Sequence, residues 1–354
     1  MKPQDTHSQN TGNKADVAVI ILNWNGEKLL REFLPQVIAT TDSSVARIIV
    51  VDNGSTDSSR AVLENEFPEV EHIFFNENYG FAEGYNKAIK LTGYKYTVLL
   101  NSDVATASSW VNVLYDFMES HPDVGACQPK ILSYSNFAKF EYAGAAGGFL
   151  DRNGYPFCRG RIFDNCEDDK GQYDSDMEVF WASGACLMVR SDLYCKVGGL
   201  DTAFFAHMEE IDLCWRIQLE GFKVMAVGGA SVYHLGGGSL PDSNPRKTYL
   251  NFRNNLLMLH KNLPDGQRGL ALLRRQLLDT IAWARYVATL KFKFASAIFR
   301  AHRDFAKMRK NYTTHPKINL LAIGSHSRIN ILVSYYLLGR RRFSSLKATS
   351  WAEC

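Results

Sequence analysis

The sequence predicts an α/β fold with a doubly wound, mostly parallel sheet and flanking helices. Apolar, β-branched runs that suit buried strands alternate with segments of helical apolar spacing up to about residue 125, and two of the strands lead into a carboxylate. Strand–helix alternation at this spacing is typical of βαβ units, in which the strands are parallel and helices cover the sheet. At 354 residues, the chain is long enough to bury a sizeable core.

The predicted elements follow one another in a regular order. Four apolar runs predict buried strands, at residues 17–22, 47–51, 70–75 and 96–100. Four segments with apolar residues at helical spacing predict helices, at residues 27–40, 58–67, 82–91 and 107–120. Beyond these, glycine and aromatic residues crowd 142–150 and acidic residues cluster at 164–176. This later stretch predicts loops and antiparallel edge strands that cover a site.

Composition and the amino-terminal segment argue against a disulfide-rich, secreted or membrane-spanning protein. Hydrophobic residues make up 46% and charged residues 22%, as in an ordinary folded protein. The seven cysteines are odd in number and include no Cys-x-x-Cys pair, which argues against a zinc ribbon or a disulfide framework and fits a reducing compartment. Residues 1–14 are polar and lack the apolar core of a signal peptide, and no apolar run is long enough to span a membrane. We expect a loose amino-terminal tail and a cytoplasmic protein.

Two predicted strands lead into carboxylates. Asp52 follows the second strand and is succeeded by the turn 53–57, while Asp103 follows the fourth strand after Asn101 and Ser102. Ligands of open α/β sheets bind at the carboxyl edge, so these positions suggest a site for a metal and a nucleotide. For the Asp52 segment, a simple turn followed by a helix cap stays open as an alternative.

Two further segments carry candidate chemistry. Residues 78–86 place glycines and asparagines around a predicted helix start, where backbone N–H groups could face a phosphate. Glu209, Glu210 and Asp212 put three carboxylates within four positions next to apolar residues, which suggests raised pKa values or a bound cation. The alternative is an exposed helix face on which Asp212 pairs with Arg216.

The order and spacing of these motifs resemble glycosyltransferase family 2. The segments 51–57, 99–103 and 209–216 carry the resemblance, and it is closest to the rhamnosyltransferase branch of bacterial surface polysaccharide synthesis. Asn23-Trp24-Asn25-Gly26 and the segment 181–190 are similar to that branch too. The resemblance covers roughly residues 17–263 and implies a GT-A fold and a nucleoside-diphosphate sugar donor.

The resemblance implies roles for the matched residues on the donor side. Asp52 would bind the nucleobase, with Asn23 and Asn25 in the same pocket, and Asn101 and Asp103 would replace the family's Asp-x-Asp motif. Asp103 would ligate a divalent metal, Mg²⁺ or Mn²⁺, that bridges the diphosphate, and His234 would be the second metal ligand. The implied nucleotide-sugar-binding residues are Asn23, Asn25, Asp52, Asn53, Gly54, Asn78, Gly80, Gly84, Asn86, Asn101, Ser102 and Asp103.

The resemblance also implies the reaction. Glu210 takes the place of the catalytic base and Glu209 is the competing candidate, because this chain has Glu-Glu where Glu-Asp is commoner. Asp212, Trp181, Ser183 and Gly184 would shape the acceptor pocket. The implied enzyme is a hexosyltransferase that inverts the anomeric centre and moves a sugar, with rhamnose as the family-weighted guess, to a glycan or a polyprenyl-linked saccharide. A glycine-rich loop after His234 would close over the donor.

The carboxyl-terminal region has a different character. Residues 268–310 carry eleven Lys or Arg and two Asp, interleaved with aromatic and aliphatic residues. Basic amphipathic helices of this kind suit the anionic inner face of the cytoplasmic membrane, although packing on the catalytic domain or on a second subunit is the alternative. Nucleic acid is a weaker option because no recognisable binding motif accompanies the charge. We expect three regions, at 1–14, 15–265 and 266–354, and the oligomeric state stays open.

Two other functions stay open from the sequence. An inactive homologue that binds glycans or acts as a scaffold would keep the fold, but the retained carboxylates argue against decay. A sugar nucleotidyltransferase would also use an α/β nucleotide domain with metal carboxylates. Such an enzyme ordinarily has a glycine-rich, basic phosphate loop after its first strand, and residues 23–26 do not form one.

Overall fold

The computed structural model describes residues 15–236, 244–313, 316–323 and 325–346. The predicted amino-terminal tail, 1–14, and most of the glycine-rich loop after His234 lie outside these residues. Within the described part of the chain, no helix is both long and apolar enough to cross a membrane.

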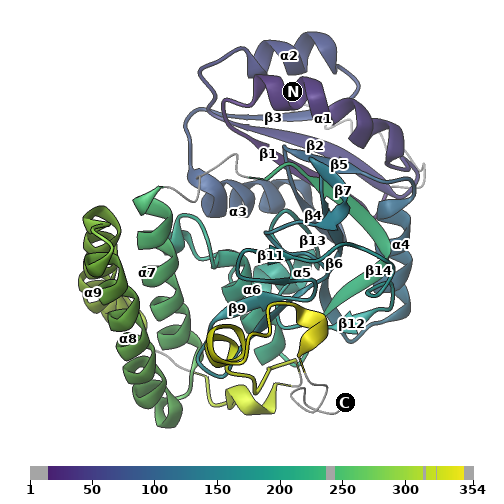
Figure 1. Ribbon diagram of the computed structural model, residues 1–354. Coiled ribbons are helices and arrows are strands. Elements are labelled where there is room, and N and C mark those ends of the chain that lie inside the picture. The colour runs from purple at the N-terminus through teal and green to yellow at the C-terminus, as the bar shows by residue number, and fades with distance from the viewer. Residues whose placement is uncertain (1–14, 237–243, 314–315, 324, 347–354) are drawn as a thin grey trace.

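A central mixed sheet organises the protein (Figure 1). In spatial order its main strands are β12 (Met177–Glu178), β14 (Lys223–His234), β6 (Val124–Ser133), β13 (Cys186–Arg190), β4 (Tyr96–Asn101), β1 (Val17–Asn23), β2 (Ala46–Asn53) and β3 (Glu71–Phe75). The run β4-β1-β2-β3 is parallel, as the sequence predicted. β13 is antiparallel to both of its neighbours, and β6 and β14 are parallel to each other. Two short strands extend the sheet: β5 (Val104–Thr106) pairs with β14, and β7 (Asn136–Phe140) pairs with β6.

Helices cover both faces of this sheet because its strands are apolar on both sides. In β1, Val17, Val19 and Ile21 belong to one core, while Ala18 and Ile20 belong to the other. The first core contains α1 (Glu27–Thr40), α2 (Ser59–Glu66) and α4 (Trp110–Ser120). The second core contains α3 (Gly80–Thr92), α5 (Ser191–Lys196) and α6 (Glu209–Leu219). The predicted doubly wound architecture is confirmed.

A second, antiparallel sheet lies beside the second core. It consists of β8 (Gly148–Leu150), β9 (Pro156–Cys158), β10 (Arg161–Ile162) and β11 (Asn165–Cys166). These strands arise from the glycine- and aromatic-rich segment for which antiparallel edge strands were predicted.

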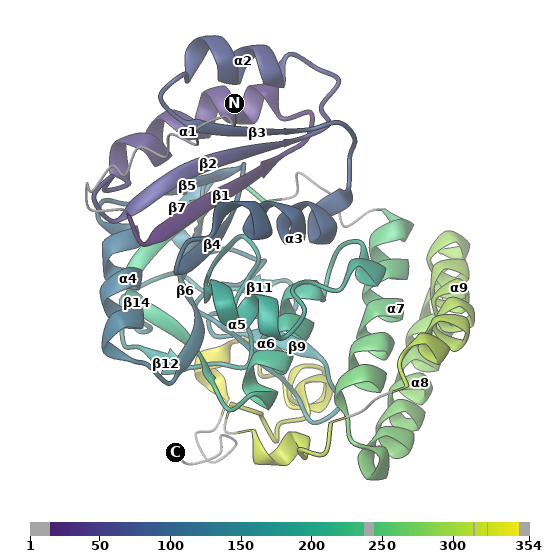
Figure 2. The same cartoon turned by 180° about the vertical axis from the view of Figure 1, so that it is seen from behind.

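Three helices follow the central sheet and pack at its side (Figure 2). They are α7 (Pro245–Asn262), α8 (Asp265–Ala288) and α9 (Phe292–Met308). The chain then returns to the small sheet, where Phe343 stacks on Phe149 at a centroid distance of 5.7 Å. The backbone N–H of Ile331 donates to Asp151 Oδ2 at 3.1 Å. The carboxyl-terminal region therefore shares the second core instead of forming one of its own.

Candidate active site

The carboxyl ends of β1 and β2 hold a buried pair of polar side chains. Asn23 and Asp52 are register partners in the β1–β2 ladder, and Asn23 Nδ2 donates a hydrogen bond of 3.0 Å to Asp52 Oδ2. The backbone N–H of Ser55 donates to Asp52 Oδ1 at 2.9 Å. Because both carboxylate oxygens have donors and both side chains are buried, the carboxylate is fixed at the sheet edge where the sequence placed it.

Asn25 and Gly54 shape the loop that follows β2. Asn25 Oδ1 accepts a hydrogen bond from the backbone N–H of Thr56 at 2.7 Å. Gly54 has a φ of +72°, and a Cβ at this position would lie 2.5 Å from the carbonyl carbon of Glu77. Two loops therefore run in backbone contact at this edge, and only glycine fits between them.

The end of β2 is tied to the start of α3 by two asparagines. Asn53 Nδ2 donates to Asn78 Oδ1 at 3.0 Å, and the N–H of Tyr79 donates to Asn53 Oδ1 at 3.0 Å. Asn78 Oδ1 also accepts from the N–H of Gly80, the first residue of α3, at 2.7 Å. Asn53, Asn78 and Gly80 therefore lie together beside the first helical turn, as the sequence suggested.

Gly84 and Asn86 make contacts within the protein, and Gly84 also borders Asn53, because a Cβ at Gly84 would lie 3.3 Å from Asn53 Nδ2. A Cβ on Gly84 would lie 2.9 Å from Leu22 Cδ2, so this glycine lets α3 approach β1 closely. Asn86 Nδ2 donates to Leu200 O at 2.8 Å, and Asn86 Oδ1 accepts from Leu200 N at 2.9 Å. Both positions are therefore used for packing within the protein, at the α3–β1 contact and at the turn after α5, and their contact with a donor stays a prediction.

Asp103 and His234 meet because β5 pairs with the end of β14. His234 lies opposite Val104 in that antiparallel pair, which brings His234 Nε2 within 3.1 Å of Asp103 Oδ1. Asn101 Nδ2 lies 3.4 Å from the same ring nitrogen, and Ser102 is in the turn between β4 and β5. The residues predicted for the metal site are therefore adjacent, although His234 is far away in the sequence.

Glu141, which the sequence did not single out, contacts the other ring nitrogen of His234. Glu141 Oε2 lies 3.3 Å from His234 Nδ1. Burial by itself would lower the pKa of His234, but hydrogen bonds and the charges of Asp103 and Glu141 raise it to about 10. A carboxylate on the second ring nitrogen orients a histidine ligand. The sequence signal for Glu141 is its place directly after the edge strand β7.

Asp103 and His234 would fit a divalent cation as two of its ligands, with the cation taking the place of the proton that the two carboxylates hold on His234. Carboxylate oxygen suits Mg²⁺ and Mn²⁺, and an imidazole nitrogen favours Mn²⁺. Both side chains are buried at one point of the sheet edge. Across residues 15–236 and the later described segments, no cluster of three or more His, Cys, Asp or Glu could enclose an ion. The remaining ligands would therefore be diphosphate oxygens and water, which Mg²⁺ commonly retains.

The first turn of α6 presents Glu209 and Glu210. Glu209 is buried, Glu210 is half-buried, and within the described residues neither Oε2 atom has a hydrogen-bond partner. Burial and the adjacent charge of Glu210 raise the pKa of Glu209 well above its usual range, and burial raises the pKa of Glu210 to about 7. A carboxyl that titrates near neutrality can act as a general base.

Gly184 lies between the carboxyl end of β4, near Asp103, and the start of α6, which carries Glu210. The N–H of Asn101, at the end of β4, donates to Ala185 O at 3.0 Å. A Cβ on Gly184 would lie 3.8 Å from Glu210 Cβ. Gly184 therefore borders both the carboxyl end of β4 and the start of α6, which fits the acceptor pocket expected there.

Trp181 and Ser183 are buried and bonded to neighbouring backbone. The Trp181 indole lies against Gly148, and its Nε1 donates to Phe149 O at 3.2 Å. The Ser183 hydroxyl donates to Ala143 O. Both residues support the segment that carries Gly184, and their contact with an acceptor stays a prediction.

Asp212 is a positioning residue. Its side chain is fully buried, Asn262 Nδ2 donates to Oδ1 at 2.7 Å, and Arg216 Nε and Lys261 Nζ each donate to Oδ2 at 2.9 Å. Burial would raise its pKa, but the charges of Arg216 and Lys261 outweigh burial and lower it. Both carboxylate oxygens are therefore occupied by protein donors, and the role in the acceptor pocket that the resemblance implied stays a prediction. The ion pair with Arg216 that the alternative interpretation expected is present, but Asp212 is buried and does not lie on an exposed helix face.

The turn that leads into α6 has an unfavourable backbone. Phe205, His207 and Met208 have φ values of +68°, +68° and +75°. Left-handed conformations cost non-glycine residues roughly 1–3 kcal/mol each, and they persist only where the surrounding structure enforces them. This strained turn lies directly before Glu210, and strained backbone of this kind is concentrated at active sites.

Asn254 on α7 enforces this turn. Its Nδ2 donates to the carbonyl oxygens of Phe204, Ala206 and His207 at 2.9, 2.9 and 2.8 Å. Arg253 adds a hydrogen bond of 2.9 Å to Phe204 O. Both side chains are buried. The sequence gives no signal for this role of Asn254, because the residues that it contacts lie about fifty positions earlier in the chain.

Replacing Asn254 by alanine is expected to lower kcat by about ten-fold or more, because the turn that carries Glu210 loses its main support. It is also expected to lower the free energy of unfolding by about 2–4 kcal/mol, since several buried carbonyls lose their donor. Steady-state kinetics and thermal unfolding of the variant test both effects.

Asn255→Ala is the matched control for Asn254→Ala. Asn255 is buried on the same helix, but it donates to Gly154 O at 2.7 Å and accepts from Arg275. It should lose similar stability and keep kcat. Equal loss of kcat in the two variants would show that Asn254 has no special role at the site.

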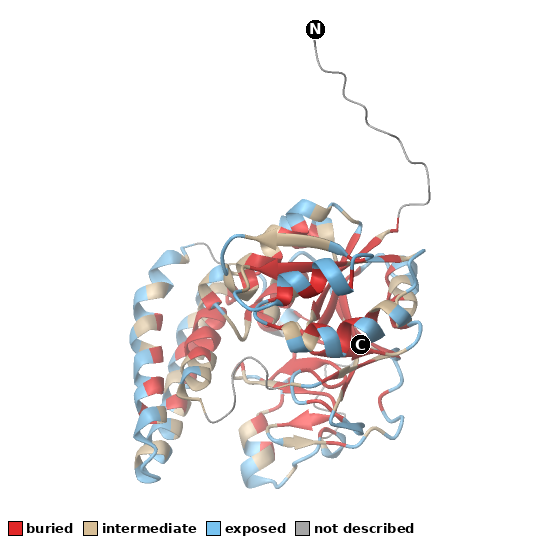
Figure 3. Ribbon diagram, turned by 90° about the horizontal axis from the view of Figure 1, so that it is seen from above, coloured by how far each residue is buried: buried red, intermediate tan, exposed pale blue. Residues whose placement is uncertain are grey.

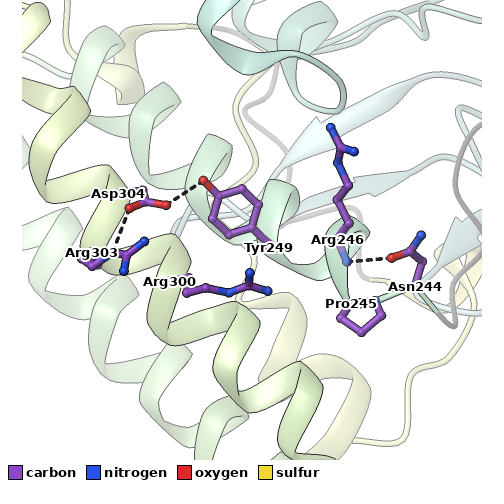
Figure 4. Close-up of a pocket in the computed structure, with 7 residues that line it drawn as sticks. All are labelled: Asn244, Pro245, Arg246, Tyr249, Arg300, Arg303 and Asp304. Atoms are coloured by element: carbon purple, nitrogen blue, oxygen red, sulfur yellow. Dashed lines mark hydrogen bonds and ion pairs between the residues drawn. The ribbon is translucent and has the colours of Figure 1, made fainter.

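A pocket of about 470 Å³ lies apart from these residues (Figure 4). It is formed between the start of α7 and α9, and none of the residues expected in the site lines it. In it Tyr249 Oη donates to Asp304 Oδ2 at 2.9 Å, and Arg303 pairs with the same carboxylate. Arg246 projects toward the turn before α6, where its guanidinium lies 4.8 Å from the Phe205 ring centroid.

The chain is similar in sequence to known glycosyltransferases. A family model described as Glycosyl transferase family 2 matches residues 18–178. The N-acetylglucosaminyl-diphospho-decaprenol L-rhamnosyltransferase of Mycobacterium tuberculosis is 26% identical over 231 residues, which cover 61% of this chain and 75% of that protein.

Two solved structures are similar in fold. Mannosyltransferase PcManGT from Pyrobaculum calidifontis, in complex with GDP-Man and Mn²⁺, superposes with a TM-score of 0.50 at 16% identity, over 87% of this chain and 88% of that one. GalNAc-T7 with UDP, GalNAc and Mn²⁺ gives a TM-score of 0.55 at 14% identity, over 72% of this chain and about half, 49%, of that one. At these identities the likeness concerns the fold, and it agrees with the GT-A architecture predicted from the sequence.

Proposed function

We propose that the protein is an inverting glycosyltransferase that uses a nucleoside-diphosphate sugar, in keeping with the match of residues 18–178 to the model of glycosyl transferase family 2. The observation that carries the proposal is the arrangement of polar groups at one sheet edge. Asp52 lies at the end of β2, Asp103 follows β4 and meets His234 at the end of β14, and Glu210 is in the first turn of α6 next to Gly184. A fold that merely bound glycans would have no need of a strained turn that presents a carboxyl with a pKa near 7.

The proposed chemistry follows from these groups. An acceptor hydroxyl is a weak nucleophile at neutral pH, so Glu210 accepts its proton as the oxygen attacks the anomeric carbon. Asp52 and Asn23 orient the nucleobase of the donor, and the loops after β2 and before α3 orient the rest of the nucleotide. A divalent cation held by Asp103 and His234 would act as a Lewis acid that neutralises the departing diphosphate. Direct attack with a single carboxylate as base gives inversion.

The donor and acceptor are proposed from the relatives. The mycobacterial relative is named for transfer of L-rhamnose to a decaprenyl-diphosphate-linked saccharide, so we propose a rhamnosyl-type donor and a polyprenyl-linked acceptor. Such an acceptor lies in a bilayer. The enzyme would then work at the inner face of the cytoplasmic membrane without spanning it.

The test is release of nucleoside diphosphate from a panel of sugar nucleotides, with Mn²⁺, Mg²⁺ or EDTA, by the wild type and Glu210→Ala. Metal-dependent release from one donor, lost in the variant, would support the proposal and identify the sugar. Donor binding without release would call for addition of lipid-linked saccharides as acceptors. No release and no nucleotide binding would overturn it in favour of a glycan-binding or scaffold protein.

The pH dependence of kcat/KM is expected to follow Glu210. A base must be ionised, and the pKa of Glu210 is raised to about 7, so activity should increase as pH rises through neutrality. Below this pKa the rate should fall about tenfold per pH unit. Initial rates between about pH 5.5 and pH 8.5 test the prediction, with circular dichroism as the control for folding. A profile that stays flat down to the usual carboxylate range would argue that Glu210 is not the base.

A further inference from the structure

Helix α8 carries an apolar stripe on its outer face. Leu270, Leu273, Leu277 and Ile281 recur at three- and four-residue spacing, and between 54% and 67% of each side chain is exposed. Figure 3 shows exposed residues along the outside of the helical bundle. The outward face of a surface helix is ordinarily polar, and an exposed apolar stripe of this kind is typical of a surface that binds another molecule or a membrane.

The inward face of α8 is polar and prevents the helix from turning over. Arg275 and Asp279 are buried and paired, with Arg275 Nε donating to Asp279 Oδ1 at 2.8 Å. His302 on α9 lies 3.1 Å from Asp279 Oδ2, Arg275 also donates to Asn255 Oδ1, and its guanidinium lies 3.8 Å from the Tyr155 ring centroid. Turning the leucines inward would break this network and bury unpaired charges, so the stripe is held toward the outside.

The charges around the stripe are of one sign. Arg274 and Arg285 are exposed on α8, and Lys291 and Lys293 are exposed at the start of α9. The two acidic residues between 268 and 310 are compensated, because Asp279 is buried against Arg275 and Asp304 pairs with Arg303. Exposed aromatic side chains, Phe292 and Phe299, lie on the same hairpin. The surface is therefore apolar and cationic, with no free carboxylate between 268 and 310.

We infer that the outer face of α8, with the basic residues around it, docks on an anionic lipid bilayer. Apolar side chains enter the headgroup boundary while Arg and Lys contact lipid phosphates, as in interfacial amphipathic helices. A second copy of the chain would also cover the leucines, but like charges would then face each other. The inference deepens the proposed function, since it supplies the surface through which a lipid-linked acceptor is reached.

The test is flotation of the full chain with vesicles, without donor or acceptor. The wild type is expected to float with vesicles of phosphatidylcholine mixed with phosphatidylglycerol, more weakly at high salt, and not with phosphatidylcholine alone. Leu273→Glu/Leu277→Glu should weaken binding at least about ten-fold, because two apolar side chains that would enter the bilayer are replaced by carboxylates. Leu91→Glu is the matched control: Leu91 is 65% exposed on α3, away from the hairpin, and its replacement should leave binding unchanged.

Three results would overturn the inference. They are absence of binding to anionic vesicles, binding by the Leu273/Leu277 variant equal to that of the wild type, and a concentration-dependent dimer that this variant dissociates while vesicle binding persists. Thermal unfolding shows whether the variants fold. Donor hydrolysis, measured separately without vesicles, reports on the proposed function, so the two failures can be distinguished.

Discussion

Glu210→Gln is expected to lower kcat by about 10²- to 10⁴-fold, which is the range that a general base contributes. The amide has nearly the same shape as the carboxyl group but cannot accept the acceptor's proton. Since Asp52, Asp103 and His234 are unchanged, KM for the donor and its binding measured by calorimetry should stay within a few-fold of the wild type. Loss confined to kcat would indicate that Glu210 acts on the reacting atoms and not on binding.

Glu209→Gln is the control for this prediction. Glu209 is the adjacent, more deeply buried carboxyl with a raised pKa, so its replacement should retain most of the activity. It should also raise the melting temperature at about pH 7 and have little effect near pH 4, because above the usual carboxylate range the unfolded chain is favoured by ionising Glu209 while the buried carboxyl stays protonated. If Glu209→Gln loses activity and Glu210→Gln does not, the roles of the two glutamates are reversed.

Asp103→Asn is expected to lower kcat/KM by about 10²- to 10³-fold, since a neutral amide is a poor substitute for a carboxylate on a hard cation. EDTA should lower the wild-type rate at least as far. The variant should need much more Mn²⁺ to reach half-maximal rate, which a metal titration measures. Asp116→Asn, on the exposed side of α4, is the control and should behave like the wild type. An Asp103→Asn rate that equals the wild type would remove Asp103 from the metal site.

Most of the central fold could be predicted because its apolar pattern is local. The helix predicted at 27–40 is α1, and the strand predicted at 96–100 is β4 with one residue added. Alternating burial in β1 follows directly from the period of a strand. The meeting of Asn23 with Asp52 was also predictable, because strands that start at equivalent points bring their ends to one edge.

The parts that could not be predicted depend on tertiary contacts. Asn25 and Asn86 are the same residue type in similar polar segments, yet one shapes the loop beside Asp52 and the other binds the turn after α5. Asp212 has the spacing of a surface ion pair with Arg216, and only Lys261 and Asn262 from α7 show that it is buried. The outward leucines of α8 look like core positions in the sequence, because helical periodicity does not say which face is covered.

The contact between Asn254 and the turn before Glu210 also bears on biosynthesis. On the ribosome, every strand of the central sheet and the whole of α6 are made before α7 exists. Until α7 emerges, the three left-handed residues of that turn lack the donor that offsets their strain. A nascent chain can therefore first complete the half that we propose to bind the nucleotide. It gains a correctly placed base only when translation has passed α7, which delays activity until the carboxyl-terminal helices are being made.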